Sequence, residues 1–188
     1  RAAAAIDEAG NTGPASAVSA SSVSIDRQGP TATITFQPAS DTGSSSSDRL
    51  TRSASPSFDL VLSDAVTDLA AGDVVLAPAS TATCTIGDPS GSGTTRTVPL
   101  TGCTDGTVIL RLTAGSITDA AGNTGPVPAV DAPIVTIDRT APTGLALTAV
   151  TTGPTASTAL TFRLAGSEDL DCSTLTAADL SITNGTFD

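Results

Sequence analysis

The sequence contains no histidine, lysine, methionine, tryptophan or tyrosine. Histidine and lysine supply the commonest general base, the Schiff-base nucleophile and the commonest zinc ligand, so their absence argues against catalysis. The absence of lysine also excludes the Lys–Asn isopeptide bonds that stiffen some surface domains. Because the aromatic residues are four phenylalanines, a core in this chain must consist mainly of valine, isoleucine, leucine and alanine.

Positive charge is scarce and is carried by arginine alone. Eight arginines face seventeen aspartates and two glutamates, and the net charge is −11. Such a surface repels nucleic acid and anionic lipid and attracts divalent cations. No apolar run reaches the length of a membrane span. We therefore expect neither nucleic acid as a partner nor membrane insertion of this segment.

Two motifs recur at one spacing. Asp-Glu-Ala-Gly-Asn-Thr-Gly-Pro at residues 7–14 returns as Asp-Ala-Ala-Gly-Asn-Thr-Gly-Pro at residues 119–126, and Ile-Asp-Arg at 25–27 returns at 137–139. Both recurrences lie 112 positions apart, which indicates tandem copies of one domain. The expected organisation is the C-terminal part of one repeat at 1–25, a complete repeat at 26–137 and the N-terminal part of another at 138–188.

The copies differ in their loops. Leu-Ala-Ala-Gly-Asp at 69–73 matches Leu-Thr-Ala-Ala-Asp at 175–179, and Ser57–Leu62 matches Ser157–Phe162, at offsets of 106 and 100. The difference lies chiefly in the Ser/Asp-rich stretch Ser40–Arg52, which has no clear counterpart in the third copy.

Short apolar runs bounded by Gly, Pro, Ser and Asp indicate β-strands joined by turns, with almost no helix. The expected strands of the complete repeat are 31–36, 58–62, 74–76, 83–86, 96–100, 107–112 and 134–137. Seven strands in a domain of this size are typical of an immunoglobulin-like Greek-key β-sandwich. The predicted fold class is therefore all-β, built of tandem sandwiches.

Two of the three cysteines, Cys84 and Cys103, lie in the complete repeat. A repetitive, helix-poor chain rich in Asp, Thr and Ser suits an exported protein, and export favours a disulfide between these two residues. Two buried free thiols are the alternative. Cys172 has no expected partner within residues 138–188.

The order and repetition of several short motifs resemble a known family. Thr-Asp-Ala-Ala-Gly-Asn-Thr at 118–124, Ile-Asp-Arg-Thr-Ala-Pro at 137–142 and Leu-Thr-Ala-Ala-Asp-Leu-Ser-Ile-Thr-Asn-Gly-Thr at 175–186 are similar to motifs of the bacterial Ig-like repeats of large surface adhesins and related exported proteins. The resemblance covers essentially the whole chain. It implies cell-surface or secreted stalks, a role in adhesion, and calcium at or near domain junctions.

If the strands alternate in direction, the start of the first strand and two loops meet at one end of the sandwich, here called the N-terminal pole. The acidic and amide side chains expected there are Asp26, Asp64, Asp68, Asp119 and Asn123, an all-oxygen set suited to calcium. Equivalent partial sets are Asp7 with Asn11 in the first copy, and Asp138 with Glu168 and Asp169 in the third. The alternative is that these Asp and Asn residues cap turns without any metal.

The leading functional hypothesis is a non-enzymatic segment of an exported bacterial surface protein, located extracellularly or at the cell surface. Neighbouring Ig-like repeats of the same chain, and like chains in a filament, are the expected partners of this stalk or spacer, with Ca2+ as its cofactor. The alternatives are a ligand-binding module of a receptor-binding protein, and an accessory domain of a secreted enzyme. The lack of Trp and Tyr weakens the glycan-binding version, since sugars usually stack on aromatic side chains.

Overall fold

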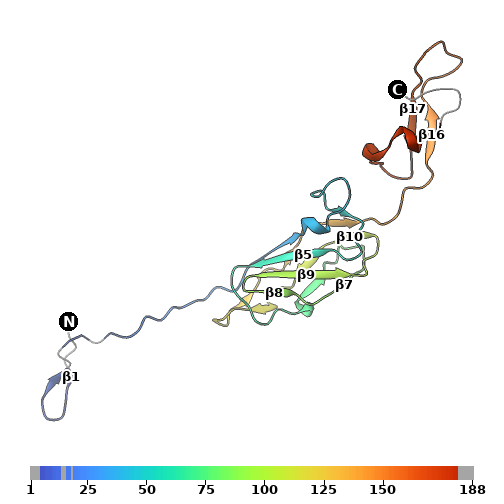
Figure 1. Ribbon diagram of the computed structural model, residues 1–188. Helices are drawn as coiled ribbons and strands as arrows, with labels where there is room; N and C mark the ends of the chain where they lie inside the picture. Colours follow the sequence, from blue (N-terminus) through green and yellow to red (C-terminus); the bar gives the residue numbers. More distant parts are fainter. Residues whose placement is uncertain (1–4, 14–15, 18, 182–188) are drawn as a thin grey trace.

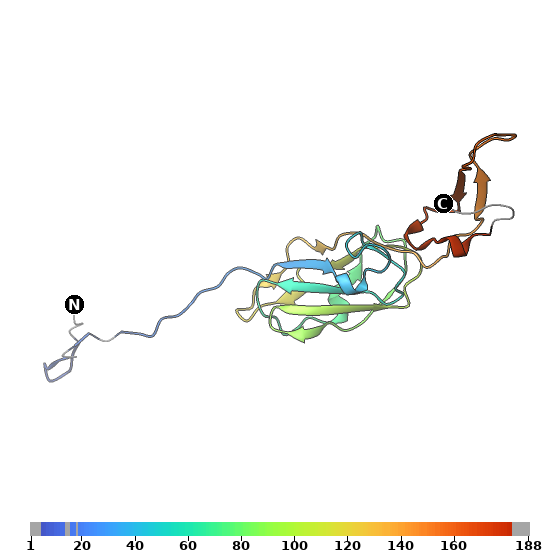
Figure 2. The same cartoon turned by 45° about the horizontal axis from the view of Figure 1, so that its top comes forward.

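The computed structural model describes residues 5–13, 16–17 and 19–181. A central β-sandwich is flanked along the chain by an N-terminal hairpin on an extended segment and by a smaller C-terminal unit at the opposite end, as Figures 1 and 2 show. Among the described residues the helical elements are four three-residue 3-10 turns, η1 (Pro38–Ser40), η2 (Ala71–Asp73), η3 (Cys172–Thr174) and η4 (Ala177–Asp179). The predicted all-β fold class is confirmed.

One layer of the sandwich is an antiparallel sheet in the order β3-β5-β9-β7, with β8 also paired to β9. Its strands are β3 (Ala32–Phe36), β5 (Ser57–Leu62), β7 (Thr85–Ile86), β8 (Ser90–Ser92) and β9 (Thr95–Thr101). Strand β5 pairs with β3 on one side and β9 on the other, and its burial alternates: Phe58, Leu60 and Leu62 are buried, while Val61 between the last two is exposed. This alternation matches the period of two of a strand with one buried face.

The facing layer contains two small sheets, β10-β15-β4 and β14-β11-β6. Their strands are β4 (Leu50–Thr51), β6 (Val74–Leu76), β10 (Gly106–Val108), β11 (Leu110–Leu112), β14 (Val130–Asp131) and β15 (Val135–Ile137). Between β11 and β14 in the sequence, β12 (Ile117–Thr118) and β13 (Thr124–Gly125) form a short hairpin. The single strand expected at 107–112 is thus divided at Ile109 into β10 and β11, which pair with different strands.

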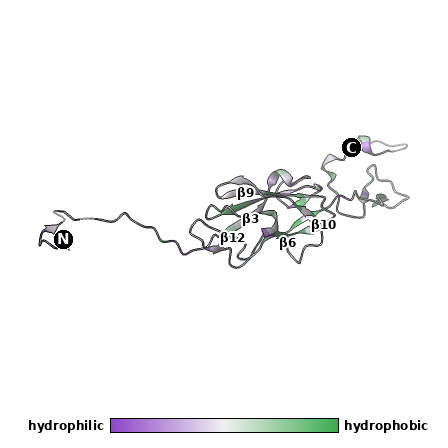
Figure 3. Ribbon diagram, turned by 90° about the horizontal axis from the view of Figure 1, so that it is seen from below, coloured by the Kyte–Doolittle hydropathy of each residue, from purple (hydrophilic) through white to green (hydrophobic). Residues whose placement is uncertain are grey.

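The core lies between the two layers and is almost entirely aliphatic, as expected from the composition. Figure 3 shows the hydrophobic colouring concentrated in the strands of the sandwich. Its most buried large side chains are Phe58, Leu60, Leu100, Leu110, Leu112, Ile117 and Ile137. One aromatic pair contributes, since the rings of Phe36 and Phe58 have centroids 5.4 Å apart.

The flanking segments repeat pieces of the sandwich. Strands β1 (Ala5–Ile6) and β2 (Thr12–Gly13) pair in the register of β12 and β13, with every position shifted by 112. Strands β16 (Ala146–Ala149) and β17 (Phe162–Ala165) form a hairpin in the C-terminal unit. Turn η4 there has the same cap as η2: the backbone N–H before each turn donates to the carboxylate of Asp179 or Asp73. The last part of the 175–186 motif, residues 182–186, lies outside the described residues.

In the described part of the chain, no helix is long and apolar enough to cross a membrane.

Candidate functional site

The repeated Asp-x-x-Gly-Asn motif forms a tight turn whose hydrogen bonds converge on Asp119. Its Oδ1 accepts from the backbone N–H groups of Ala121 (2.8 Å) and Asn123 (2.9 Å), and its Oδ2 accepts from the Asn123 side-chain amide at 2.9 Å. Gly122 is required because its φ is +89°, a conformation that residues with a Cβ rarely adopt. The motif therefore specifies its own turn between β12 and β13.

The first copy forms the same turn without a surrounding sandwich. Asp7 accepts from the N–H groups of Ala9 (3.0 Å) and Asn11 (2.9 Å), and from the Asn11 side-chain amide at 2.9 Å. Gly10 has φ +87°. Since local sequence alone produces this arrangement twice, the turn-capping role considered for Asp7, Asn11, Asp119 and Asn123 is present in the structure.

These hydrogen bonds favour the charged carboxylate, and they hold the pKa of both Asp7 and Asp119 below the usual value, with the asparagine side chain as the largest cause in each. A carboxyl group whose folded pKa is depressed stabilises the fold above its unfolded pKa, and this stability is lost as pH falls through the folded pKa.

Acid titration tests the role of Asp119. Below the unfolded pKa of about 3.9, the wild-type melting temperature should fall steadily as Asp119 is protonated, whereas Asp119→Asn should show a shallower fall and a lower melting temperature at neutral pH. The exposed Asp88→Asn, in the loop between β7 and β8, is the control and should follow the wild type. Parallel acid curves for wild type and Asp119→Asn would contradict this role.

The incoming linker, which ends at Pro30, packs against the β12–β13 turn at the N-terminal pole. A Cβ built on Gly29 would overlap the carbonyl oxygen of Thr124, and one built on Gly125 would overlap the carbonyl oxygen of Pro30. The two backbones thus touch where no side chain fits, and Pro30 is buried. Thr31 completes the anchor by donating its N–H to the Ser63 hydroxyl at 2.9 Å.

The structure brings the first strand, the loop after β5 and the β12–β13 turn to the N-terminal pole, as expected. Val66 forms an isolated β-bridge with Asp119, and Asp68 accepts from the N–H of Thr118 at 3.1 Å. Asp64 instead accepts from the Ser63 hydroxyl, and Asp26 caps the N–H of Gln28. Within the described residues, no group of three or more His, Cys, Asp or Glu side chains is close enough to hold a metal ion.

The outgoing linker is fixed to the opposite end of the sandwich, here called the C-terminal pole. Asp138 donates its N–H to the Thr51 carbonyl at 2.9 Å, directly after β15 pairs with β4. Arg139 donates from its guanidinium to the Cys103 carbonyl at 3.2 Å, and the Thr140 hydroxyl donates to the Asp105 carboxylate at 2.7 Å. Three consecutive linker residues are therefore bound to the complete repeat.

The next anchored residue, Thr143, already belongs to the C-terminal unit. Its N–H donates to the Ser167 hydroxyl at 3.0 Å, and Ser167 returns its own N–H to the Thr143 carbonyl at 2.9 Å. This reproduces the Thr31–Ser63 anchor of the complete repeat. Ala141 and Pro142 alone separate the two anchored segments, and the φ angle of proline is fixed.

Two acidic residues predicted to act together approach one another across this junction. Burial, and next the carboxylate of Asp138, raise the pKa of Glu168. Glu168 follows Ser167 in the C-terminal unit, whereas Asp138 precedes Ala141 and Pro142 and also accepts the N–H of Thr140 at 3.0 Å. Asp169, the third member of the expected set, is exposed.

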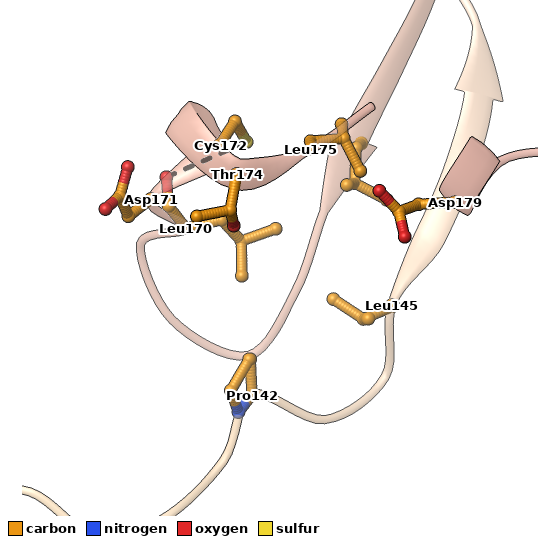
Figure 4. Close-up of a pocket in the computed structure, with 9 residues that line it drawn as sticks. Pro142, Leu145, Leu170, Asp171, Cys172, Thr174, Leu175 and Asp179 are labelled. Carbon is orange, nitrogen blue, oxygen red and sulfur yellow. Dashed lines mark hydrogen bonds between the residues drawn. The ribbon is translucent and has the colours of Figure 1, made fainter. Parts of the chain in front are cut away.

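The C-terminal unit carries an apolar hollow of about 210 Å³. Pro142, Leu145, Leu170 and Leu175 surround it, as Figure 4 shows. Cys172 lies at its edge and is an exposed free thiol whose sulfur is 3.8 Å from the Leu170 carbonyl oxygen. Asp171, Thr174 and Asp179 also line the hollow, and Leu145 and Leu175 are exposed, so its apolar side chains are only partly covered.

Cys84 and Cys103 form the expected disulfide. Cys84 immediately precedes β7 and Cys103 follows β9, so the bond fastens the end of this antiparallel pair at the C-terminal pole. Because the Cys103 carbonyl also receives the Arg139 side chain, the disulfide supports the outgoing linker as well.

Sequence reasoning missed the residues that hold the two linkers. Gly29 and Asp105 belong to no motif, and although Gly125 and Thr140 lie in the motifs at 119–126 and 137–142, these motifs do not show which residues they contact. The recurrence of these motifs 112 positions apart pointed only to a shared structural role.

Residues 28–139 match the sequence model of a family described as "Bacterial Ig-like domain". The matched span is more than half of the chain, and it covers the sandwich, the incoming anchor around Gly29 and Pro30, and Asp138 and Arg139 of the outgoing linker. No curated protein matches the chain.

Proposed function

This chain belongs to the bacterial Ig-like domain family, and we propose that it is a non-enzymatic structural segment of an exported bacterial surface protein, in which tandem repeats form a stiff stalk or spacer. Domains of this family are structural or surface modules and are commonly extracellular. The observation that carries the proposal is the two-residue hinge between Thr140 and Thr143, since so short a connection restricts how neighbouring repeats reorient.

Both poles of the sandwich support this mechanical role. Backbone contact at Gly29 and Gly125 fixes the incoming chain, while Arg139 and Thr140 fix the outgoing one. Chain ends anchored at opposite poles transmit force along the long axis of the sandwich (Figure 1). Flexible linkers, by contrast, are longer and rich in Gly and Ser.

Spin labels test the stiffness of this hinge in the full chain. One label is attached to the exposed native thiol of Cys172 and the other to Thr33→Cys on the outer face of β3, with the disulfide kept oxidised. Double electron–electron resonance should give one narrow distribution of distances between the two labels, because the hinge allows little reorientation of one unit against the other. Arg139→Ala with Asp105→Ala should broaden it, because the linker loses two anchors.

The control for this experiment is Asp88→Ala, which lies away from the hinge and should leave the distribution narrow. A broad distribution in the otherwise wild-type chain would refute a stiff stalk and would favour a binding module on a flexible tether.

Calcium binding at the junctions is also part of the proposal. Its support is the approach of Asp138 and Glu168, whose mutual repulsion a divalent cation would relieve. We expect calcium to raise the melting temperature relative to a chelator, because a ligand that binds only the folded state stabilises it. Glu168→Gln and Asp138→Asn should remove this part of the increment, and Asp88→Asn should retain it. Identical melting curves in calcium and in chelator would mean that these acidic residues bind no calcium and serve only to form turns.

A further inference from the structure

The Ser/Asp-rich loop absent from the third copy contains a buried carboxylate with an unusual environment. Asp41 follows η1 and is 9% exposed. Among the described residues, its Oδ1 is the one buried side-chain polar atom that lacks a hydrogen-bond partner. Buried polar atoms in native proteins almost always have a partner, and an exception commonly marks a bound water or ion.

The comparison with Asp119 shows how unusual this is. Asp119 is similarly buried, at 8% exposure, yet its two oxygens receive three N–H donors. Asp41 receives one, from the backbone of Arg49 to Oδ2 at 3.0 Å. The ion pair found in the described part of the chain joins Arg111 and Asp131, so no arginine side chain balances the Asp41 charge.

The loop cannot easily turn this carboxylate out to solvent, because hydrogen bonds join the two ends of the loop. The Thr51 hydroxyl donates to the Ser40 carbonyl at 2.6 Å, and the Thr42 hydroxyl accepts the N–H of Arg52 at 2.8 Å. Thr42 and Thr51 are also hydrogen-bonded to each other at 3.1 Å. These bonds hold Asp41 inward, although an uncompensated charge in such a place is unfavourable.

The chemistry of the loop indicates what compensates this charge. Between Asp41 and Arg49 the side chains are those of Thr42, four serines and Asp48, so every side-chain donor atom is oxygen. Hard cations take carboxylate, hydroxyl and carbonyl oxygens, whereas zinc and softer metals prefer nitrogen and sulfur. A bound water would supply a hydrogen bond but would leave the negative charge unbalanced.

We propose that the loop 41–49 binds a hard alkali or alkaline-earth cation, with Asp41 Oδ1 as its buried ligand. This site lies at the C-terminal pole, beside β4. Its ligand Asp41 is not one of the acidic residues considered at the junctions, although Thr42 and Gly43 of the loop line a hollow together with Asp138. A cation there would order the loop next to β15 and the outgoing linker. The proposal does not depend on the stalk function.

The test is an amide NMR titration of the full chain with Na+, K+, Mg2+ and Ca2+ in a choline chloride background. The binding cation should shift the amide resonances of Thr42 and Arg49 saturably, and the four arms identify the ion. Asp41→Asn should lose these shifts, because it retains the oxygen but removes the charge. Asp48→Asn, in the same loop but exposed, should retain them.

The cation-free NMR spectrum guards against a folding defect: Asp41→Asn should keep the wild-type amide resonances of residues outside loop 41–49. Calorimetric titration should then show no heat of binding at this loop in Asp41→Asn, while Asp48→Asn and Glu168→Gln keep it. Absence of shifts at Thr42 and Arg49 with all four cations would overturn the proposal. The proposal would also be overturned if Asp41→Asn melted at a higher temperature than the wild type and the difference did not depend on any cation. The uncharged side chain would then suit the buried position better than the carboxylate.

Discussion

Breaking the Cys84–Cys103 disulfide is expected to lower the free energy of unfolding by about 3 kcal/mol. The bond closes a loop with a sequence separation of 19 and so restricts the unfolded chain. For a domain of this size the melting temperature should fall by roughly 10 to 20 °C. Scanning calorimetry with and without reductant, and on the Cys84→Ala/Cys103→Ala double variant, measures the loss.

A matched control is available in the third cysteine. Cys172 is exposed and free, so Cys172→Ser should leave the sandwich transition unchanged. Because the Cys103 carbonyl accepts the Arg139 guanidinium, the Cys84→Ala/Cys103→Ala variant, which adds no further thiol to label, should also show a broader distance distribution in the spin-label experiment. Equal melting temperatures for the oxidised and reduced chains would mean that the β7–β9 pairing alone holds this end of the sandwich.

The Gly125→Ala substitution should destabilise the sandwich by about 3 kcal/mol, at the upper end of typical overpacking. The added Cβ would overlap the backbone of Pro30, which cannot move as a flexible side chain would. Either the incoming linker separates from the β12–β13 turn or the turn itself shifts. Chemical denaturation measures the loss of stability, and the amide resonance of Thr31 should report the displaced linker.

Gly13→Ala is the control for this substitution. Gly13 holds the same position in the first copy of the motif, but a Cβ there meets nothing within 4 Å. This variant should therefore unfold like the wild type. If Gly125→Ala were equally harmless, the contact between linker and turn would not contribute to the stability of the repeat.

Much of the fold was predictable because its determinants are local. The alternation of Phe58, Leu60 and Leu62 predicted a strand with one buried face, and β5 has that face. The Asp-x-x-Gly-Asn motif joins residues no more than four positions apart, so its hydrogen bonds form in both copies. The sequence left open whether this motif caps a turn or binds calcium, and the turn accounts for the hydrogen bonds observed.

The arrangement of the candidate sites required the tertiary structure. Gly29 meets Thr124 at the N-terminal pole, and Arg139 meets Cys103 at the C-terminal pole, only because the sandwich brings together segments that are distant in sequence. The unpartnered oxygen of Asp41 is likewise set by how the loop closes on Arg49 and not by its serine-rich composition. No periodicity records such contacts, since they depend on the path of the whole chain.

One pair of residues separates the two contributions most clearly. Val23 and Val135 occupy the same position of the repeat, two residues before an identical Ile-Asp-Arg motif. The sequence determined the repeat, the turns and the alternation of apolar residues in both places. Val135 is fully buried in β15, which pairs with β10 and β4. Val23 is 84% exposed because the described residues before it form only the β1–β2 hairpin, so no strand equivalent to β10 or β4 is there to pair with it. Neighbouring strands decide the burial of a β-strand residue, and these strands come from parts of the chain that only tertiary folding brings together.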